Sequence, residues 1–263
     1  MSFQPIIPFG GIAGWSFLQS TRTAQQETFE AAPVLERDTT YFRENIGKVT
    51  SAEDLVGDYR LLKVALGAFG LDDDLPNKAF IRKVLEEGSL DSDSFANRMV
   101  DKRYLALSEA FGFDLGTPNT QLSDFAGRLI DSYNTRQFEI AVGTQDTDMR
   151  LSLALERDLG EIVETDNTAD GKWYAILGNE PLLTVFRTAL NIPAETAGLD
   201  IDVQVDLLRD RAAATFGDGE IAQFADPQRL EALNRTFLVR SQIADASAGM
   251  SSGAIALTLL QGL

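Results

Sequence analysis

The chain has 263 residues, with 23 Lys and Arg against 40 Asp and Glu, a formal net charge of −17, and neither Cys nor His. The acidic balance argues against nucleic acid and against anionic membranes as partners, because both are bound through basic surfaces. Without Cys and His the sequence excludes disulfides, thiol nucleophiles, Ser-His-Asp triads and Cys or Cys/His zinc sites. We predict no cofactor and no metal, and a chain long enough for one large domain or two small ones.

Both ends of the chain are apolar and nearly uncharged. Arg22 is the only charged side chain before Glu27, and residues 246–263 carry no charge. Residues 1–26 are interpreted as a neutral N-terminal arm and residues 246–263 as a neutral C-terminal helix. No Lys or Arg precedes the first apolar stretch, and Pro and Gly interrupt it, so a cleaved secretory signal is not expected. The C-terminal stretch is too short and too polar to predict a membrane span.

Helix signals follow one another along the chain, whereas strand alternation is hard to find. A capping box begins at Ser51, and Pro76, Pro181 and Pro227 stand near predicted helix starts. The sequence therefore predicts an all-α fold, a multi-helix bundle of helical hairpins without a substantial sheet. The predicted helices span residues 14–31, 38–46, 51–69, 76–87, 93–111, 120–142, 145–163, 171–177, 180–190, 200–215, 220–224, 227–247 and 250–261.

Several of these helices end in an apolar residue followed by glycine, which is typical of a left-handed C-cap. The glycines concerned are Gly70, Gly112, Gly143, Gly178 and Gly217. In the helix at 227–247, three- and four-residue spacing predicts a buried stripe. That stripe comprises Leu230, Leu233, Phe237, Val239 or Arg240, and Ile243.

A polar stretch without apolar periodicity, residues 164–171, is the best candidate for a linker. It divides the chain into a helical N-terminal lobe at 27–163 and a helical C-terminal lobe at 171–245. The sequence leaves open whether these lobes are two domains or parts of one.

Two weak internal similarities occur. Residues 61–71 match residues 182–192 at an offset of 121, and residues 68–72 match residues 110–114 at an offset of 42. Such offsets are typical of duplicated or stacked helical units. The alternative is that helix ends share the same few residue types, and the sequence alone does not choose between them.

Acidic clusters at Asp72–Asp74, Asp91–Asp93 and Asp200–Asp202 begin like calcium loops. None continues with the glycine and the bidentate carboxylate that an EF-hand needs, so we interpret them as acidic helix N-termini. The glycines at residues 10–14 lack the Lys of a P-loop and the strand of a dinucleotide-binding motif, and predict a flexible or tightly packed segment. No catalytic residue is predicted.

The uncharged ends carry the candidate interaction residues. Apolar and small residues recur three and four positions apart in a seam formed by Ile243, Ala246, Met250, Gly253, Leu257 and Leu260. The candidate protein-interaction residues are Trp15, Phe17, Leu18, Met250, Leu257, Leu259 and Leu260. Two interpretations stay open: the ends dock on the chain's own core, or they bury against another protein.

Six segments resemble an uncharacterised bacterial family, known only as a domain of unknown function and often encoded beside flagellar genes. These segments are residues 8–18, 37–43, 78–88, 101–113, 177–183 and 224–227. The resemblance spans nearly the whole chain and implies a shared fold, a flagellar association and no defined activity. The apolar stretch at 254–260 is also loosely similar to the C-termini of flagellins and other axial proteins.

The expected function is that of a non-enzymatic structural or accessory protein of the flagellar apparatus, acting through contacts with other proteins, either flagellar components or further copies of itself. Such a protein would lie in the bacterial cytoplasm or be exported through the flagellar machinery. One alternative is an acidic cytoplasmic export chaperone or adaptor that holds an amphipathic helix of its partner. A second is a carboxylate-dependent enzyme, which would need a pocket containing carboxylates with perturbed pKa values.

Overall fold

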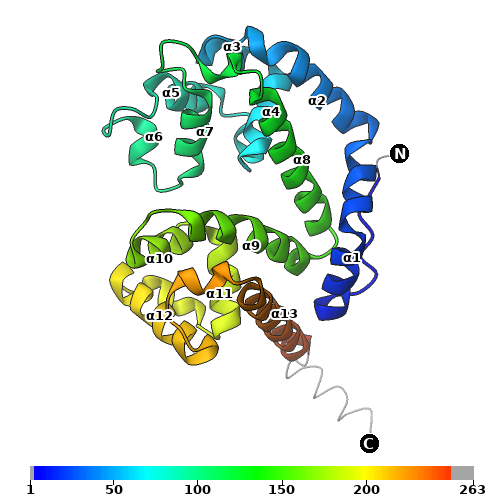
Figure 1. Cartoon of the computed structure of the whole chain (residues 1–263), viewed down its shortest axis with the longest axis vertical. Coiled ribbons are helices and arrows are strands. Elements are labelled where there is room, and N and C mark those ends of the chain that lie inside the picture. Colours follow the sequence, from blue (N-terminus) through cyan, green and yellow to red (C-terminus); the bar gives the residue numbers. More distant parts are fainter. Residues whose placement is uncertain (1–2, 250–263) are drawn as a thin grey trace, which may run out of the picture. The chain divides into compact units, whose positions relative to one another are not determined.

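The computed structural model describes residues 3–249 of the chain (Figure 1). Within this range it contains thirteen α-helices, five short 3₁₀ helices and no strand, which confirms the predicted all-α fold. The chain divides into two compact units. Unit 1 comprises Met1–Ile6 and Ser20–Val142, and unit 2 comprises Ile7–Gln19 and Gly143–Leu263.

The elements follow in order along the chain. The first half contains α1 (Gly11–Glu30), α2 (Pro33–Asn45), η1 (Ile46–Lys48), α3 (Ala52–Gly57), α4 (Tyr59–Ala68), η2 (Asp72–Asp74), α5 (Lys78–Glu87), α6 (Phe95–Arg98), α7 (Arg103–Phe111), η3 (Asn119–Gln121) and α8 (Phe125–Gly143). The second half contains α9 (Thr147–Glu164), α10 (Ala169–Leu177), α11 (Glu180–Leu190), η4 (Ala194–Gly198), α12 (Ile201–Phe216), η5 (Ile221–Ala225) and α13 (Pro227–Gly249).

The boundary between the units differs from the predicted linker at residues 164–171. It falls between Val142 and Gly143, so α9 belongs to unit 2 and not to the N-terminal lobe at 27–163. Helix α9 buries Met149, Leu153 and Leu159, and it packs against α11, α13 and η5. The polar stretch is a short loop that ends in the first turn of α10, where the Thr168 hydroxyl accepts a hydrogen bond from the Gly171 N–H.

The core of unit 1 is built on α4, every residue of which from Val64 to Ala68 is buried. Helices α2 and α3 pack on α4, and α3 also packs on α5. The rings of Phe111 and Phe125 meet edge to face with centroids 5.2 Å apart, so aromatic packing joins α7 to the start of α8.

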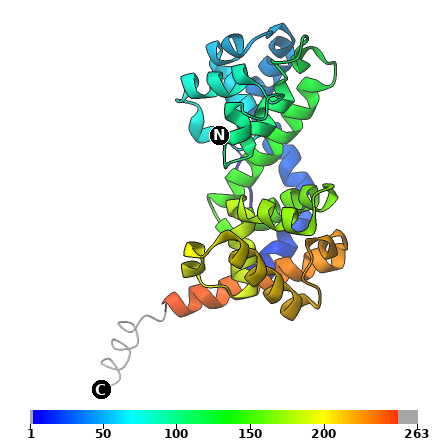
Figure 2. The same ribbon diagram turned by 90° about the vertical axis from the view of Figure 1, so that its left-hand side faces the viewer.

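Unit 2 repeats this order of packed helices. Helices α9 and α10 pack on α11 as α2 and α3 pack on α4, and α10 packs on α12 as α3 packs on α5. In each unit a 3₁₀ helix, η2 or η4, follows the central helix. Figure 2 gives a second view of the helices in each unit.

The central helices of the two units begin and end alike. Asp58 caps α4 and Asn179, 121 residues later, caps α11, each through a side-chain oxygen that accepts from backbone N–H groups. Each helix is followed by a left-handed residue, Gly70 with φ 69° and Asn191 with φ 52°, again 121 residues apart. The offset in the sequence therefore corresponds to a repeated local structure.

Two predicted helices are each divided in the structure. The helix at 51–69 breaks at Asp58, whose extended backbone (φ −98°, ψ 110°) lets its carboxylate accept from Arg60 and Leu61. The helix at 93–111 breaks after α6, and Asp101 accepts a hydrogen bond from the backbone N–H of Arg103 at the start of α7. In both places a local aspartate–backbone bond competes with helix continuation.

Three of the predicted glycine caps, Gly70, Gly112 and Gly217, have positive φ. At the other two, helices end as predicted, but the glycine is not left-handed. Gly143 is the last residue of α8, and Gly178 has φ −80°. Gly178 leads directly into Asn179, the cap of the next helix, so no left-handed turn is needed there.

Candidate protein-interaction site

The predicted N-terminal arm is part of the fold. Trp15 and Leu18 in α1 are 6% and 0% exposed. A Cβ added to Gly14 would lie 1.9 Å from the carbonyl oxygen of Phe9 and 3.4 Å from the Cε of Met149, so the backbone packs closely at this point. The Gln19 amide donates to Glu156 of α9 across 3.4 Å. The first half of α1 is therefore packed within unit 2.

The residues before α1 are also held in place. The Ile6 N–H donates to Gln25 Oε1 across 2.6 Å, and Gln25 Nε2 donates to the Ile6 carbonyl across 3.2 Å. Gln25 is 7% exposed, so this pair of hydrogen bonds is largely buried. It holds the segment that contains Ile6 against α1. The tightly packed interpretation of the glycine-rich segment agrees with these contacts.

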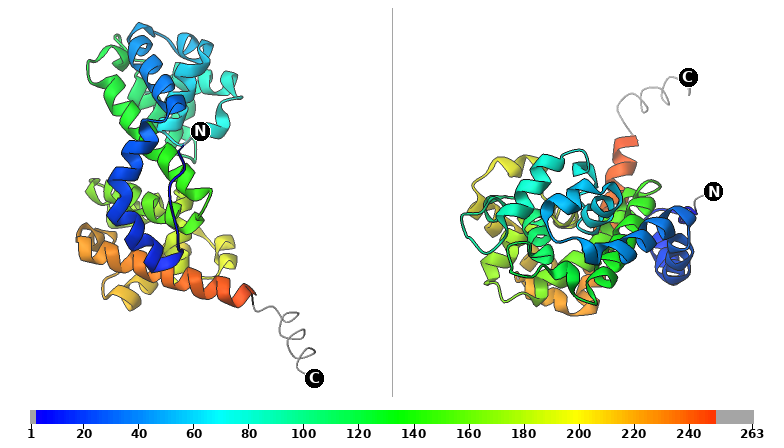
Figure 3. Two further views of the ribbon diagram at one scale, coloured as in Figure 1. Left: turned by 90° about the vertical axis from the view of Figure 1, so that its right-hand side faces the viewer. Right: turned by 90° about the horizontal axis from the view of Figure 1, so that it is seen from above.

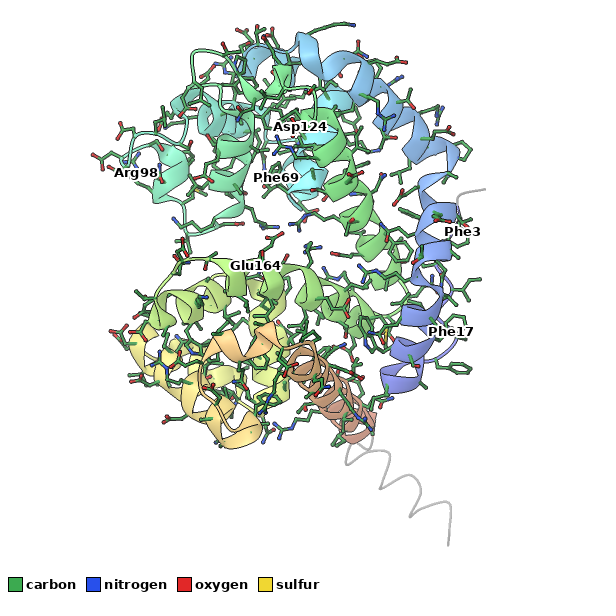
Figure 4. The ribbon with its side chains drawn as sticks, in the orientation of Figure 1. Phe3, Phe17, Phe69, Arg98, Asp124 and Glu164 are labelled. Atoms are coloured by element: carbon green, nitrogen blue, oxygen red, sulfur yellow. The ribbon has the colours of Figure 1, made fainter. Side chains whose placement is uncertain are left out.

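Of the seven candidate interaction residues, the structure describes three. Trp15 and Leu18 are buried within the chain, and Phe17 is half-buried on the side of α1 turned away from α9 and α13 (Figure 4). Met250, Leu257, Leu259 and Leu260 lie outside the described residues.

Helix α13 consists of two halves that differ in burial. Its first half contributes Leu233, Asn234, Phe237 and Leu238 to the core, each at most 3% exposed. From residue 239 to residue 246 no side chain is buried. Figure 3 shows the C-terminal half of α13 projecting from the other helices of unit 2.

An apolar stripe runs along this exposed half. It consists of Val239, Ile243 and Ala246, all of which are exposed. The exposed fraction is 37% for Val239 and 59% for Ile243. Their spacing of four and then three residues places them on one helical face. We call them the α13 stripe. The prediction that the buried stripe continues through Val239 or Arg240 to Ile243 is therefore wrong, because the inward face is completed by Asn234 and Leu238.

An open cleft of about 620 Å³ lies beside the α13 stripe. Gln242 and Asp245 line it from α13, opposite residues from the start of α1 and the start of α9. The full set, which we call the acidic cleft, is Gly10, Gly11, Asp146, Thr147, Asp148, Gln242 and Asp245. The left view in Figure 3 shows the beginning of α1 beside α13.

The backbone conformation of Gly11, where α1 meets α13, favours glycine. Its φ of 63° is in the left-handed region, and an added Cβ would lie 2.0 Å from Nε2 of Gln242. The glycine thus permits the helix start to approach the wall of the cleft.

Three carboxylates give the cleft its charge. Partial burial raises the pKa of Asp148, a hydrogen bond with Ser241 opposes that shift, and the neighbouring Asp146 and Asp245 raise the pKa further. The Asp146 side chain also caps α9 by accepting from the Met149 N–H across 3.1 Å. Within residues 3–249 none of the three carboxylates forms a salt bridge.

Sequence reasoning found only part of this site. The seam pattern identified Ile243 and Ala246, whereas Val239 was predicted only as an alternative to Arg240 in the buried stripe, and the cleft was not predicted. The carboxylates come from two distant parts of the sequence, Asp146 and Asp148 from one and Asp245 from the other. Only the packing of α9 against α13 brings them together. The only local signal was Asp146 in an N-cap position before α9.

In the described part of the chain, no group of three or more acidic residues is placed to hold a metal ion. This includes the acidic cleft and the clusters at Asp72, Asp91 and Asp200. No helix between residues 3 and 249 is long and apolar enough to cross a membrane.

Comparison with known families gives a match over residues 68–230 to the family described as Protein of unknown function (DUF1217). The chain belongs to the DUF1217 family. The matched region includes the central helix of unit 2 and much of unit 1, but ends near the start of α13. The predicted resemblance to an uncharacterised family is confirmed.

A solved structure extends the likeness beyond the family match. The crystal structure of protein AGR_C_984 from Agrobacterium tumefaciens is 27% identical in sequence, with a TM-score of 0.74. The similarity covers 92% of this DUF1217 chain and 99% of that one. No curated protein matches the sequence.

Proposed function

We propose that this DUF1217 protein is a non-enzymatic structural or accessory component of the bacterial flagellar apparatus that acts through contacts with other proteins. The observation that carries the protein-contact part is the exposed C-terminal half of α13, with its apolar stripe. The flagellar part rests on the six segments that resemble a family often encoded beside flagellar genes. The protein would act in the bacterial cytoplasm or after export through the flagellar apparatus.

The α13 stripe is suited to a protein partner for a physical reason. Val239 and Ile243 are branched apolar side chains on a regular helix, where an exposed position gains nothing from their hydrophobicity. An amphipathic helix face of this kind commonly binds a complementary helix through anchors at i, i+4 and i+7. The surface therefore gains stability when another protein covers it.

The acidic cleft favours a second candidate, the cytoplasmic export chaperone or adaptor. A cleft adjoining an apolar stripe offers a place in which to hold a segment of a client protein. The two candidates differ in where the protein resides, because a chaperone stays in the cytoplasm and a flagellar component is found with the assembled apparatus. Fractionation of cells and purified flagella, followed by detection of the protein, distinguishes them.

The raised pKa of Asp148 favours a third candidate, a carboxylate-dependent enzyme, because general acids use such shifts. Small-molecule sites are, however, lined mostly by hydrophobic and aromatic side chains. The acidic cleft is lined by two glycines and five polar residues and is open to solvent. This lining supports recognition of a protein surface better than enclosure of a substrate.

The test is complementation in the source bacterium. Deleting the gene is expected to impair motility or flagellar assembly, and the full-length protein restores it. Ile243→Glu, which places a charge on the α13 stripe, is expected to fold normally and fail to restore motility. Val203→Glu in α12 is the matched control, since Val203 is also an exposed apolar helix residue, 49% exposed.

Two outcomes would contradict the proposal. Unchanged motility in the deletion strain would remove the flagellar role. Full restoration by Ile243→Glu would show that the α13 stripe does not contact a partner that matters for motility.

A further inference from the structure

We infer that the α13 stripe and the acidic cleft together bind an amphipathic helix of another protein, with Lys or Arg flanking its apolar face. This inference rests on the proposed protein-contact function and specifies the chemistry of the partner. It combines two observations on one side of unit 2: exposed apolar side chains, and three carboxylates that form no salt bridge within residues 3–249.

The α13 stripe and the acidic cleft are adjacent, so one helical ligand can contact both. Gln242 and Asp245, which line the cleft, lie on α13 directly beside Ile243 and Ala246. A helix lying on the α13 stripe would therefore have one flank over the cleft. Lys or Arg side chains on that flank can reach carboxylates while their aliphatic stems cover apolar surface.

The electrostatics of the cleft favour a cation from outside. In the described chain, the residues lining the cleft include no Lys or Arg. Asp146 and Asp245 act on Asp148 as like charges, so placing a cation among them removes repulsion and adds attraction. The gain depends on ionic strength, because the cleft is open to solvent.

The same charges disfavour a second copy of this chain as the occupant. Each copy has a net charge of −17, and a symmetric contact through α13 would bring two acidic clefts together. Neither cleft would supply a cation to the other. A partner with basic residues beside an apolar helix face meets both requirements.

The test uses the full-length protein and two synthetic peptides of about 18 residues, long enough to form an amphipathic helix. Both carry the same Leu and Ala face, flanked by Lys in one peptide and by Glu in the other. Fluorescence anisotropy measures their affinity. We expect the Lys peptide to bind, the Glu peptide to bind at least about tenfold more weakly, and the binding to weaken as NaCl rises from about 50 to about 300 mM.

Variants separate local recognition from general attraction to an acidic protein. Asp148→Asn/Asp245→Asn is expected to weaken binding of the Lys peptide by about tenfold, as expected for losing two partly screened charge pairs. The control Asp166→Asn/Asp210→Asn removes the same charge from exposed positions elsewhere in unit 2 and is expected to leave affinity within about twofold. Ile243→Glu tests the apolar contact.

Each outcome has a defined meaning. Equal binding of the two peptides, or equal effects of the two double variants, would overturn the inference. So would concentration-dependent dimerisation that Ile243→Glu abolishes, seen by light scattering without peptide binding, since the occupant would then be a second copy. If Ile243→Glu fails in complementation while Asp148→Asn/Asp245→Asn keeps full affinity, the proposed function stands and only the partner's charge is wrong.

Discussion

The N-terminal segment and the second half of α13 are similar in sequence and differ in burial. Residues 3–26 and the second half of α13 are both apolar and poor in charge, yet Trp15 and Leu18 are buried whereas Val239 and Ile243 are exposed. The N-terminal segment is fixed by close packing at Gly14 and by the two hydrogen bonds of Gln25. The C-terminal half of α13 extends beyond the helices that cover its first half.

The difference shows that lack of charge has two separate causes. In α1 a carboxylate at position 15 or 18 would lie in the core, where an unpaired charge is costly. On α13, a charge at position 243 would remain in water and cost the isolated chain little. The apolar α13 stripe is better explained by contact with a partner than by the stability of the fold.

The largest expected effect on the free energy of unfolding comes from removing a buried side chain of α1. Trp15→Ala removes a side chain that is 6% exposed and is expected to lower the free energy of unfolding by about 3–5 kcal/mol. Urea denaturation followed by circular dichroism measures this. Phe17→Ala, two residues away on the half-buried side, is the control and should cost clearly less. Equal costs would mean that α1 is not docked through Trp15.

Glycine substitutions give a smaller effect with opposite signs at two positions. Gly14→Ala places a Cβ against the Phe9 carbonyl oxygen and is expected to cost about 1–3 kcal/mol. Gly160→Ala in the middle of α9 meets no atom within 4 Å and is expected to add about 0.5–1 kcal/mol through helix propensity. Thermal unfolding of both variants, compared with the parent protein, tests the pair. A neutral Gly14→Ala would remove the argument for close backbone packing at the start of α1.

Most of the helices could be predicted from the sequence because their signals are local. Ser51, Asn179 and Pro227 begin helices as predicted, and Gly112 and Gly217 end them. The offset of 121 residues also had a structural counterpart in α4 and α11. The breaks at Asp58 and Asp101 were missed because an aspartate can cap a helix or occupy its first turn, and sequence does not separate the two roles.

Long-range packing explains why the rest could not be predicted. The placement of α9 in unit 2 depends on its contacts with α11 and α13, which leave no local signal. The acidic cleft likewise needs Asp148 and Asp245 to meet from helices nearly a hundred positions apart. Helical periodicity placed Ile243 both in the predicted buried stripe and in the predicted interaction seam. Because Leu238 and Asn234 occupy the buried face of α13, Ile243 is exposed.

A still smaller effect is expected from the charge of the cleft. Because the pKa of Asp148 is raised in the folded protein, the folded state holds this proton more tightly than the unfolded state. Protonation of Asp148 therefore stabilises the folded state at pH values below the ordinary aspartate pKa of about 3.9. This stabilisation is lost as the pH rises through the raised pKa of Asp148 in the folded protein. Asp148→Asn should increase stability at pH 7 by up to about 0.5 kcal/mol, as for relief of like-charge repulsion, and the gain should disappear at low pH.

Urea denaturation of the parent protein and Asp148→Asn across a pH series measures this dependence. Asp210→Asn serves as the control because Asp210 is an exposed carboxylate of α12 outside the cleft. A gain that is the same at all pH values, or one that Asp210→Asn reproduces, would show that the cleft does not set the protonation of Asp148.

The smallest expected effect on stability is at the α13 stripe itself. Ile243→Ala is expected to change the free energy of unfolding by less than about 0.5 kcal/mol, because the side chain is 59% exposed. Leu238→Ala, five residues earlier and 0% exposed, is expected to cost about 2–5 kcal/mol on the same helix. Urea denaturation measures both, and a large loss at Ile243 would mean that this half of α13 is held by the fold. A side chain that stability does not require, yet whose replacement by Glu abolishes restoration of motility, is one that acts on a partner.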